Sequence, residues 1–226
     1  MRYASLVAAF LIVGCSAEKA SDPAPVASQA AAPVPADAPV ILAFGDSLYA
    51  GYQLNPGEGY PPRLEAALLA AGTPARLVNA GVSGDTTAAA LQRLAFTLDN
   101  QPVKPVLALV GLGGNDMLRG LPPEETRANL DAILTEFDKR DIPVVLTGML
   151  AAPNMGESYG KRFNGIWPEL AKKHEAALVP FFLKPVLGNK ALMLEDNVHP
   201  NAVGVERIVA ATQGTVAAAL KAAVSK

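Results

Sequence analysis

A serine, a histidine and an aspartate occupy places in the sequence where they could form a nucleophilic triad. Ser47 directly follows an apolar run, 39–45, and Asp46, while Asp196 and His199 lie close together near the C-terminal end. An aspartate can fix the tautomer of a histidine, and that histidine can take the proton of a serine hydroxyl. The serine oxygen then becomes a nucleophile. These residues therefore predict acyl transfer, with Ser47, His199 and Asp196 as the catalytic residues.

Each of these residues also has an ordinary structural interpretation. Asp46 and Ser47 belong to residue types that commonly cap helices. Asp196 and His199 could be ordinary loop residues. The other histidine, His174, lies in the polar stretch ELAKKHEAA and is predicted to be a surface residue of a helix. The triad is the favoured interpretation because turns with suitable polar groups follow other apolar runs as well.

Two of those turns could supply hydrogen-bond donors to an oxyanion. Gly81 opens a glycine turn after the run ARLVNA, and Asn115 follows the run PVLALVGL. Preorganised donors stabilise the negative oxygen of a tetrahedral intermediate, and removal of one donor typically raises the barrier by ~3 kcal/mol. The glycines could instead serve positive φ angles, and Asn115 could cap a helix. Asp46 and Asp116 are interpreted as residues that fix turns.

Five predicted strands position these side chains. The runs PVILAF, ARLVNA, PVLALVGL, IPVVLTGM and ALVPFF are short, rich in Val, Leu and Ile, and typical of buried parallel strands. Amphipathic helices are expected around 60–71, 85–98, 122–141, 158–175 and 201–222. This alternation predicts an α/β fold with a five-stranded parallel sheet covered by helices on both faces. Ligands of such sheets bind at the carboxyl ends of the strands, where the candidate residues lie.

The N-terminal segment has the layout of an export signal. Its apolar stretch is too short to span a bilayer comfortably, and the only cysteine, Cys15, follows Ile-Val-Gly, which resembles the lipobox of bacterial lipoproteins. We expect a signal over 1–15 that is cleaved before Cys15, a lipid on Cys15, an Ala/Pro-rich tether over 16–38 and one folded domain over 39–226. The alternative is a signal peptide cut near 28–32.

The charge and the cysteine content of the chain limit which partners and cofactors it could bind. The chain has 226 residues, half of them apolar, and a formal net charge of −2 with no basic region, so nucleic acid is not an expected partner. Because Cys15 is either lipidated or cleaved off with the signal, no thiolate remains for a disulfide or a metal site. We expect a periplasmic monomer held at a membrane through Cys15, or alternatively a secreted protein, with no cofactor and no metal.

Four motifs of the chain resemble the four blocks of the GDSL or SGNH hydrolases, which are named for their Ser, Gly, Asn and His. Within that superfamily, residues 39–222 look most like the bacterial thioesterase, arylesterase and lysophospholipase group. The Gly-x-Ser-x-Gly turn of the α/β-hydrolases is absent. The four motifs are Gly45-Asp46-Ser47-Leu48, Gly81, Gly113-Gly114-Asn115-Asp116 and Asp196-Asn197-Val198-His199.

The resemblance implies a three-layer α/β/α, flavodoxin-like sandwich with strand order 2-1-3-4-5. It also implies that Ser47 is the nucleophile, that Asp196 and His199 complete the triad, and that the oxyanion hole consists of the Ser47 and Gly81 N–H groups and the Asn115 side chain. No cofactor is implied.

The segment 148–167 bears on the substrate. Its glycines and isolated large side chains suggest a mobile wall over the site, with Met155, Tyr159 and Phe163 as candidate substrate-binding residues. In the resembled group the corresponding loop shapes the acyl or aryl pocket, and the stretch NMGES departs from that group. Alternatively, Phe163 belongs to a helix face that is part of the core, together with Ile166, Trp167 and Leu170.

The sequence therefore predicts an exported serine esterase that acts on aryl or acyl esters or thioesters, and on lysophospholipids as one such class. A carbohydrate O-acetylesterase on the same fold is the nearest alternative. A nucleotide-binding module is disfavoured because no phosphate-binding loop has the right spacing. A metal-dependent phosphoesterase that uses Asp46, Asp116 and His199 is disfavoured because these turns offer few carboxylates. A binding domain without catalysis would not require the triad.

Overall fold

A five-stranded parallel sheet forms the centre of the molecule. The computed structural model describes residues 33–225. All strand pairs are parallel, and the strand order is β2-β1-β3-β4-β5, which confirms the predicted fold class and order. The strands are β1 (Val40–Gly45), β2 (Arg76–Asn79), β3 (Leu107–Gly111), β4 (Val144–Thr147) and β5 (Ala177–Val179).

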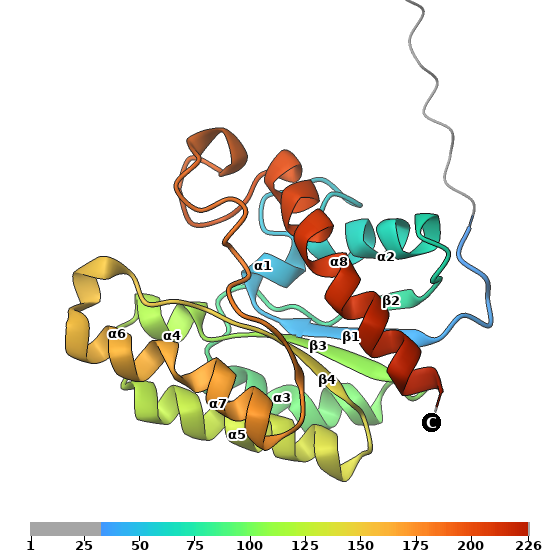
Figure 1. The fold of residues 1–226 in the computed structure, drawn as a ribbon, viewed down its shortest axis with the longest axis horizontal. Helices are drawn as coiled ribbons and strands as arrows, with labels where there is room; N and C mark the ends of the chain where they lie inside the picture. The colour runs from blue at the N-terminus through green and yellow to red at the C-terminus, as the bar shows by residue number, and fades with distance from the viewer. Residues whose placement is uncertain (1–32, 226) are drawn as a thin grey trace, which may run out of the picture. The chain divides into compact units, whose positions relative to one another are not determined.

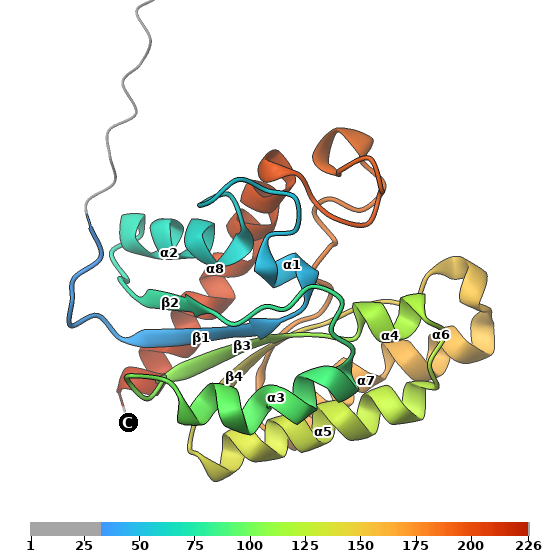
Figure 2. The ribbon, with the colours of Figure 1, turned by 180° about the vertical axis from the view of Figure 1, so that it is seen from behind.

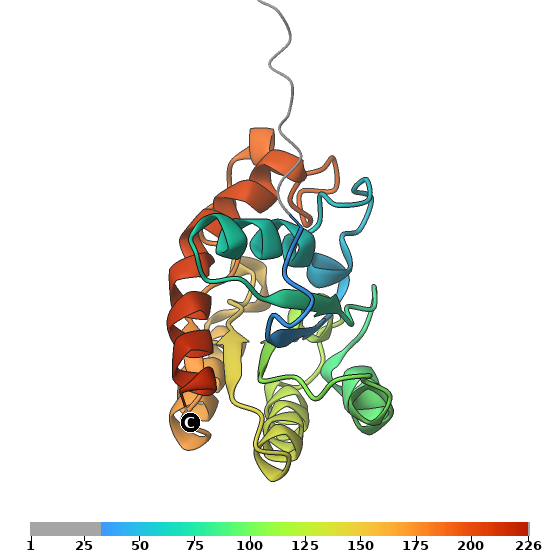
Figure 3. The ribbon, with the colours of Figure 1, turned by 90° about the vertical axis from the view of Figure 1, so that its right-hand side faces the viewer.

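Helices cover both faces of the sheet and complete three layers (Figures 1, 2 and 3). Helices α2 and α8 pack together on one face, and α3, α5 and α7 cover the other. Short helices α1 and α4 follow β1 and β3 directly. The helices are α1 (Ser47–Ala50), α2 (Tyr60–Ala70), α3 (Thr87–Asp99), α4 (Gly114–Leu118), α5 (Pro123–Lys139), α6 (Glu157–Asn164), α7 (Ile166–Lys173) and α8 (Ala202–Val224), with 3-10 turns at Pro153–Met155 and Lys190–Leu192.

The single helix predicted over 158–175 is two helices in the structure. Helix α6 ends at Asn164 and α7 begins at Ile166. Pro168 has no N–H to donate to the carbonyl of Asn164, so the helix cannot continue through this point unchanged. The prediction that Phe163 and its helical neighbours belong to the core is confirmed, because Phe163 and Ile166 are fully buried and Trp167 is 1% exposed.

The central strands carry the core. Every residue of β1, β3 and β4 is buried, whereas the edge strand β2 is only partly covered. This pattern is expected of parallel strands with helices on both sides. In residues 33–225 no helix is long and apolar enough to cross a membrane. The predicted signal over 1–15, the lipidation of Cys15 and most of the predicted tether lie outside the described residues.

The close approach of Tyr49 to β3 makes Gly111 essential to the core. A Cβ atom at Gly111 would lie 2.5 Å from Tyr49 Cε1 and 2.8 Å from Thr147 Oγ1, and these two side chains hydrogen-bond to each other. Gly111→Ala is therefore expected to lower the free energy of unfolding by about 1–3 kcal/mol through overpacking. Urea denaturation measures this loss. Gly160→Ala is the control, because no atom lies within 4 Å of a Cβ there, and alanine at this helical position should stabilise slightly.

Candidate active site

Ser47 lies where β1 ends and α1 begins, at the carboxyl edge of the sheet. Asp46 is the N-cap of α1, and its Oδ1 accepts a hydrogen bond of 3.0 Å from the Leu48 N–H. The helix-cap interpretation of Asp46 is therefore confirmed. Ser47 is the first residue of the helix and is 9% exposed, and its backbone N–H has no hydrogen-bond acceptor among residues 33–225. Both the hydroxyl and the free N–H of Ser47 are thus placed at a positive helix end.

The structure brings Ser47, His199 and Asp196 into contact. His199 Nε2 lies 2.8 Å from Ser47 Oγ, and His199 Nδ1 lies 2.6 Å from Asp196 Oδ2. The other carboxylate oxygen, Asp196 Oδ1, accepts hydrogen bonds from the backbone N–H groups of Val198 and His199 at 2.9 and 3.0 Å. The chain reverses at Asn197, which has a φ of 54°. This turn lets the carboxylate fold back onto the imidazole.

The hydrogen bonds around Asp196 keep it charged. Desolvation acts to raise the pKa of Asp196, but the hydrogen bonds from the His199 backbone, the His199 ring and the Val198 N–H outweigh it and lower the pKa below the ordinary value. Asp196 is therefore a carboxylate at neutral pH, as it must be to stabilise an imidazolium on His199.

The loop that carries His199 is fixed at both ends. Leu194 donates its N–H to the carbonyl of His199 at 2.8 Å, and Met193 forms a bridge with Pro200. Asn201 caps α8 by accepting a hydrogen bond from the Gly204 N–H at 2.9 Å. One face of the His199 ring is covered by the ring of Tyr52, with the centroids 4.5 Å apart. The imidazole is thus held in one place by neighbouring loops.

Asn115 and Gly84 face the same cavity as Ser47. Asn115 Nδ2 donates to the carbonyl of Asp85 at 2.9 Å, which fixes the amide and leaves its second N–H available. The Gly84 N–H has no acceptor within residues 33–225, and the φ of Gly84 is 86°. These groups, with the Ser47 N–H, are the donors that an oxyanion in this cavity would meet.

The structure does not bring the predicted Gly81 to the cavity. The Gly81 N–H donates instead to Asn79 Oδ1 at 2.9 Å. A Cβ at Gly81 would lie 2.5 Å from the backbone nitrogen of Ala50, so the glycine permits the close approach of this turn to α1. The prediction of Gly81 as an oxyanion donor is therefore wrong, and Gly84, three residues later in the same turn, has the free N–H.

Two buried carboxyl groups, those of Asp116 and Asp46, hold the backbone next to the site in place through hydrogen bonds. Asp116 accepts hydrogen bonds from the N–H and hydroxyl of Thr87 and from the hydroxyl of Thr126, and so ties α4 to α3 and α5. Asp46 is 2% exposed. Burial, with the Leu48 hydrogen bond opposing it and the nearby Asp116 and Asp85 adding to it, raises the pKa of Asp46 from 3.8 to about 7. These contacts match the prediction that Asp46 and Asp116 fix turns.

The raised pKa of Asp46 gives a stability prediction. The folded state binds a proton more tightly than the unfolded state, so the contribution of Asp46 to stability is lost as the pH rises from about 4 to about 7. Asp46→Asn keeps an acceptor for Leu48 without the charge. We expect it to raise the free energy of unfolding by about 1–3 kcal/mol at pH 8 and to change it little at pH 4. Urea denaturation at both pH values measures this, with the exposed Asp37→Asn as control; equal effects at both pH values would contradict it.

The cavity in front of Ser47 and His199 has a volume of about 590 Å³ and a wall made mainly of apolar side chains. The loop after β4 supplies a continuous part of this wall, and the loop after β5 supplies another. The residues from these two loops are Met149, Leu150, Ala151, Ala152 and Pro153, and Phe181, Leu183 and Leu187; Leu48, Tyr52, Met117, Leu118 and Val198 complete the apolar part.

The predicted substrate-binding residues Met155, Tyr159 and Phe163 do not line this cavity. Phe163 is fully buried between Tyr159 and Trp167, with ring centroids 5.5 and 4.8 Å away. The Tyr159 hydroxyl donates to the carbonyl of Leu121. The segment 148–167 does reach the site, but through the residues directly after β4, because the chain then turns away into α6. The prediction of these three residues is therefore wrong.

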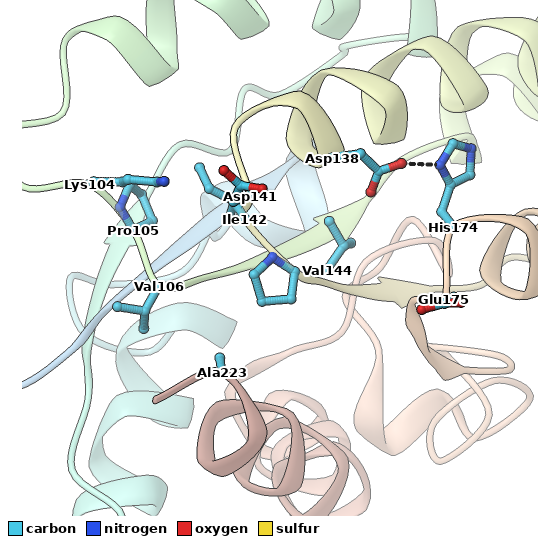
Figure 4. A pocket seen from close by; sticks show the side chains of 11 residues that line it. Lys104, Pro105, Val106, Asp138, Asp141, Ile142, Val144, His174, Glu175 and Ala223 are labelled. Carbon is cyan, nitrogen blue, oxygen red and sulfur yellow. Dashed lines mark hydrogen bonds and ion pairs between the residues drawn. The ribbon is translucent and has the colours of Figure 1, made fainter. Parts of the chain in front are cut away.

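A second hollow lies at the opposite edge of the sheet, where β3, β4 and β5 begin (Figure 4). His174 lines it, but its Nδ1 lies 2.5 Å from Asp138 and its Nε2 2.7 Å from Asp131. The His174 side chain is only 6% exposed, so the prediction of a surface residue is wrong. Both ring nitrogens are engaged by carboxylates of α5, so the histidine of this hollow is not free to act as a base. The groups that could perform acyl transfer lie only in the cavity of Ser47, within the part of the chain that the structure describes.

Residues 33–225 contain no group of three or more His, Cys, Asp or Glu side chains arranged to hold a metal ion. Asp116 is committed to Thr87 and Thr126, and Asp46 to the start of α1. These contacts explain why the acidic residues next to the site do not converge.

Comparison with known proteins identifies the family of the chain. A model of the GDSL-like Lipase/Acylhydrolase family matches residues 43–207. The chain is 38% identical over 160 residues to the "Arylesterase" of Vibrio mimicus, covering 71% of this chain and 79% of that protein. It is 36% identical over 166 residues to "Thioesterase 1/protease 1/lysophospholipase L1" of Escherichia coli strain K12, covering 74% of this chain and 77% of that protein.

Solved structures share the fold. The crystal structure of AlinE4, described as an SGNH-hydrolase family esterase, superposes with a TM-score of 0.70 at 58% identity, over 81% of this chain and 97% of that chain. The resemblance read from the four sequence motifs is therefore confirmed at the level of the family and of the fold.

Proposed function

Because the chain belongs to the GDSL-like lipase/acylhydrolase family and is a hydrolase of the esterase type, we propose that it cleaves esters or thioesters through an acyl-enzyme on Ser47. The observation that carries this proposal is the unbroken contact from Asp196 through His199 to Ser47, with distances of 2.6 and 2.8 Å. These distances suit proton transfer from the serine hydroxyl to a histidine base.

In the first half-reaction Ser47 Oγ attacks the carbonyl carbon while His199 Nε2 takes the hydroxyl proton. The negative oxygen of the tetrahedral intermediate is stabilised by the N–H groups of Ser47 and Gly84 and the free N–H of Asn115. Asp196 stabilises the imidazolium that forms. His199 then gives its proton to the leaving alcohol or thiol, and the acyl group remains on Ser47.

In the second half-reaction a water molecule replaces the leaving group. His199 takes a proton from that water, the hydroxide attacks the acyl-enzyme, and the same donors stabilise the second oxyanion. The acid leaves and Ser47 regains its proton from His199. None of these steps needs a cofactor.

The apolar wall of the cavity supports an acyl or aryl group as the part of the substrate that is bound. Methionine, leucine and proline side chains after β4 and β5 face Ser47, and few polar groups accompany them. Apolar groups of this kind gain free energy when they leave water. This lining favours aryl and acyl esters, including lysophospholipids, over a carbohydrate O-acetyl group, which would need polar partners for the sugar.

Export and anchoring are part of the proposal. The sequence of residues 1–15 supports a cleaved signal, and Cys15 supports a lipid that holds a periplasmic monomer at a membrane. Mass spectrometry of the protein isolated from membranes tests this, because a lipidated Cys15 at the new N-terminus adds the mass of the acyl chains.

A series of p-nitrophenyl esters from acetate to palmitate tests the proposed activity. We expect hydrolysis to peak at a medium or long chain, because the apolar wall extends beyond the triad. Activity confined to acetate would contradict the acyl assignment and favour a deacetylase. If the Ser47→Ala variant hydrolysed these esters as fast as the unaltered protein, the proposed mechanism would be excluded.

A further inference from the structure

Exposed apolar side chains gather around the mouth of the cavity. Leu187 is 58% exposed, Leu118 57%, Leu150 41% and Tyr52 39%, and all four line the cavity. They come from four separate loops or short helices, so their clustering is a feature of the fold and not of one sequence segment. Single exposed apolar residues are ordinary, but a cluster at one place indicates an interaction site. We call these four residues the apolar rim.

The first part of the loop between β5 and α8 places two positive charges beside this rim, whereas Glu195 and Asp196 near the end of the loop are acidic. Residues 181–192, the lysine lobe, project from the body of the molecule beside the start of α8 (Figures 1 and 2). Lys184 and Lys190 are exposed on the lobe, on either side of Leu187 in the sequence. No Asp or Glu occurs between Glu175 and Glu195. The lobe is therefore locally cationic on a chain whose net charge is −2.

We propose that the apolar rim and the lysine lobe together dock on the surface of an anionic phospholipid bilayer. Exposed leucines flanked by lysines fit such a surface, because the apolar side chains enter the interface while the ammonium groups meet anionic headgroups. The surface surrounds the opening of the cavity, so docking points the cavity at the lipid. The hollow at the opposite edge of the sheet is lined by Lys104 together with Asp138, Asp141 and Glu175, and none of its lining residues is a large exposed apolar side chain (Figure 4).

Flotation with lipid vesicles tests the proposal independently of catalysis. The protein is the chain from Ser16, which lacks the proposed lipid anchor. It keeps every apolar residue that is buried within residues 33–225, since these lie between Ala38 and Leu220. It carries Ser47→Ala so that no lipid is hydrolysed. We expect binding to vesicles of phosphatidylglycerol and phosphatidylcholine, weaker binding to phosphatidylcholine alone, and loss of the difference at 1 M salt.

Substitutions locate the surface. Lys184→Gln and Lys190→Gln are each expected to lower the partition into anionic vesicles about fivefold, and Leu187→Ser about tenfold. Phe96→Ser is the matched control, because Phe96 is 72% exposed on α3, away from the cavity, and its partition should not change.

Three results would overturn the proposal. The first is that the protein does not bind anionic vesicles, and the second is vesicle binding that none of the three substitutions reduces. The third is a dimer in solution that Leu187→Ser dissociates, because the rim would then be covered by a second copy of the chain. Failure of vesicle binding would leave the proposed ester hydrolysis intact, since a soluble p-nitrophenyl ester still measures it.

Discussion

Replacement of Ser47 by alanine is expected to lower kcat for a soluble p-nitrophenyl ester by about 10⁴- to 10⁶-fold. The hydroxyl that His199 contacts at 2.8 Å is then missing, and no covalent intermediate can form. The residual rate comes only from the oxyanion donors and from binding. The fold should not change, because alanine suits the first turn of α1 and the cap contact of Asp46 with Leu48 stays in place.

The control for this prediction is Ser158→Ala, at an exposed position of α6. Its kcat should equal that of the unaltered protein. The double variant Ser47→Ala/His199→Ala gives a sharper test, because residues that act as one unit have non-additive effects. We expect it to lose hardly more than Ser47→Ala alone. A double variant that loses the product of the two single effects would show that Ser47 and His199 act independently.

The fold was largely predictable because its signals are local. The central strands are continuous apolar runs, since both of their faces are buried, and the topology then brings the ends of β1, β3 and β5 to one edge. Ser47, Asn115 and His199 could be placed together for this reason, although they are far apart in the sequence. The Asp196 contact could be predicted as well, because the carboxylate and the imidazole share one short loop.

The choice between Gly81 and Gly84 could not be made from the sequence. Both glycines lie in one turn. In the structure Gly81 permits a close approach to α1, and Gly84 has the positive φ that is the alternative role predicted for the turn glycines. The deciding fact is the hydrogen bond from the Gly81 N–H to Asn79, which depends on how the turn packs on α1. Backbone donors carry no side-chain signal, so their availability follows only from the three-dimensional arrangement.

The substrate wall was missed for a different reason. The prediction favoured the large side chains of 148–167, but large apolar residues at helical spacing belong to the core, as the burial of Phe163 and Trp167 demonstrates. The residues that reach the cavity, such as Met149 and Leu150, directly follow β4. Position after a strand at the carboxyl edge was the signal that would have found them. His174 was misjudged because its carboxylate partners lie on another helix, α5.

Replacement of Asn115 by alanine is expected to lower kcat by about 10²- to 10³-fold with little change in KM. The Asn115 amide is held by the carbonyl of Asp85 at 2.9 Å, so its second N–H is aimed before the substrate arrives. A donor whose hydrogen bond to the oxyanion is stronger than its hydrogen bond to the ground-state carbonyl raises kcat and leaves KM nearly unchanged. Steady-state kinetics with a p-nitrophenyl ester separate the two constants.

Asn129→Ala is the matched control for Asn115→Ala. Asn129 is also a partly buried amide that makes one hydrogen bond, to Thr87 Oγ1, but it does not line the cavity. Both variants lose about 1 kcal/mol of stability through the missing hydrogen bond, so thermal unfolding should respond similarly. Only Asn115→Ala should lose kcat. If both variants lost kcat equally, Asn115 would be a structural residue. If Asn115→Ala raised KM alone, Asn115 would bind the ground state and the transition state equally. In either case the stabilisation specific to the oxyanion would come from the Ser47 and Gly84 N–H groups without it.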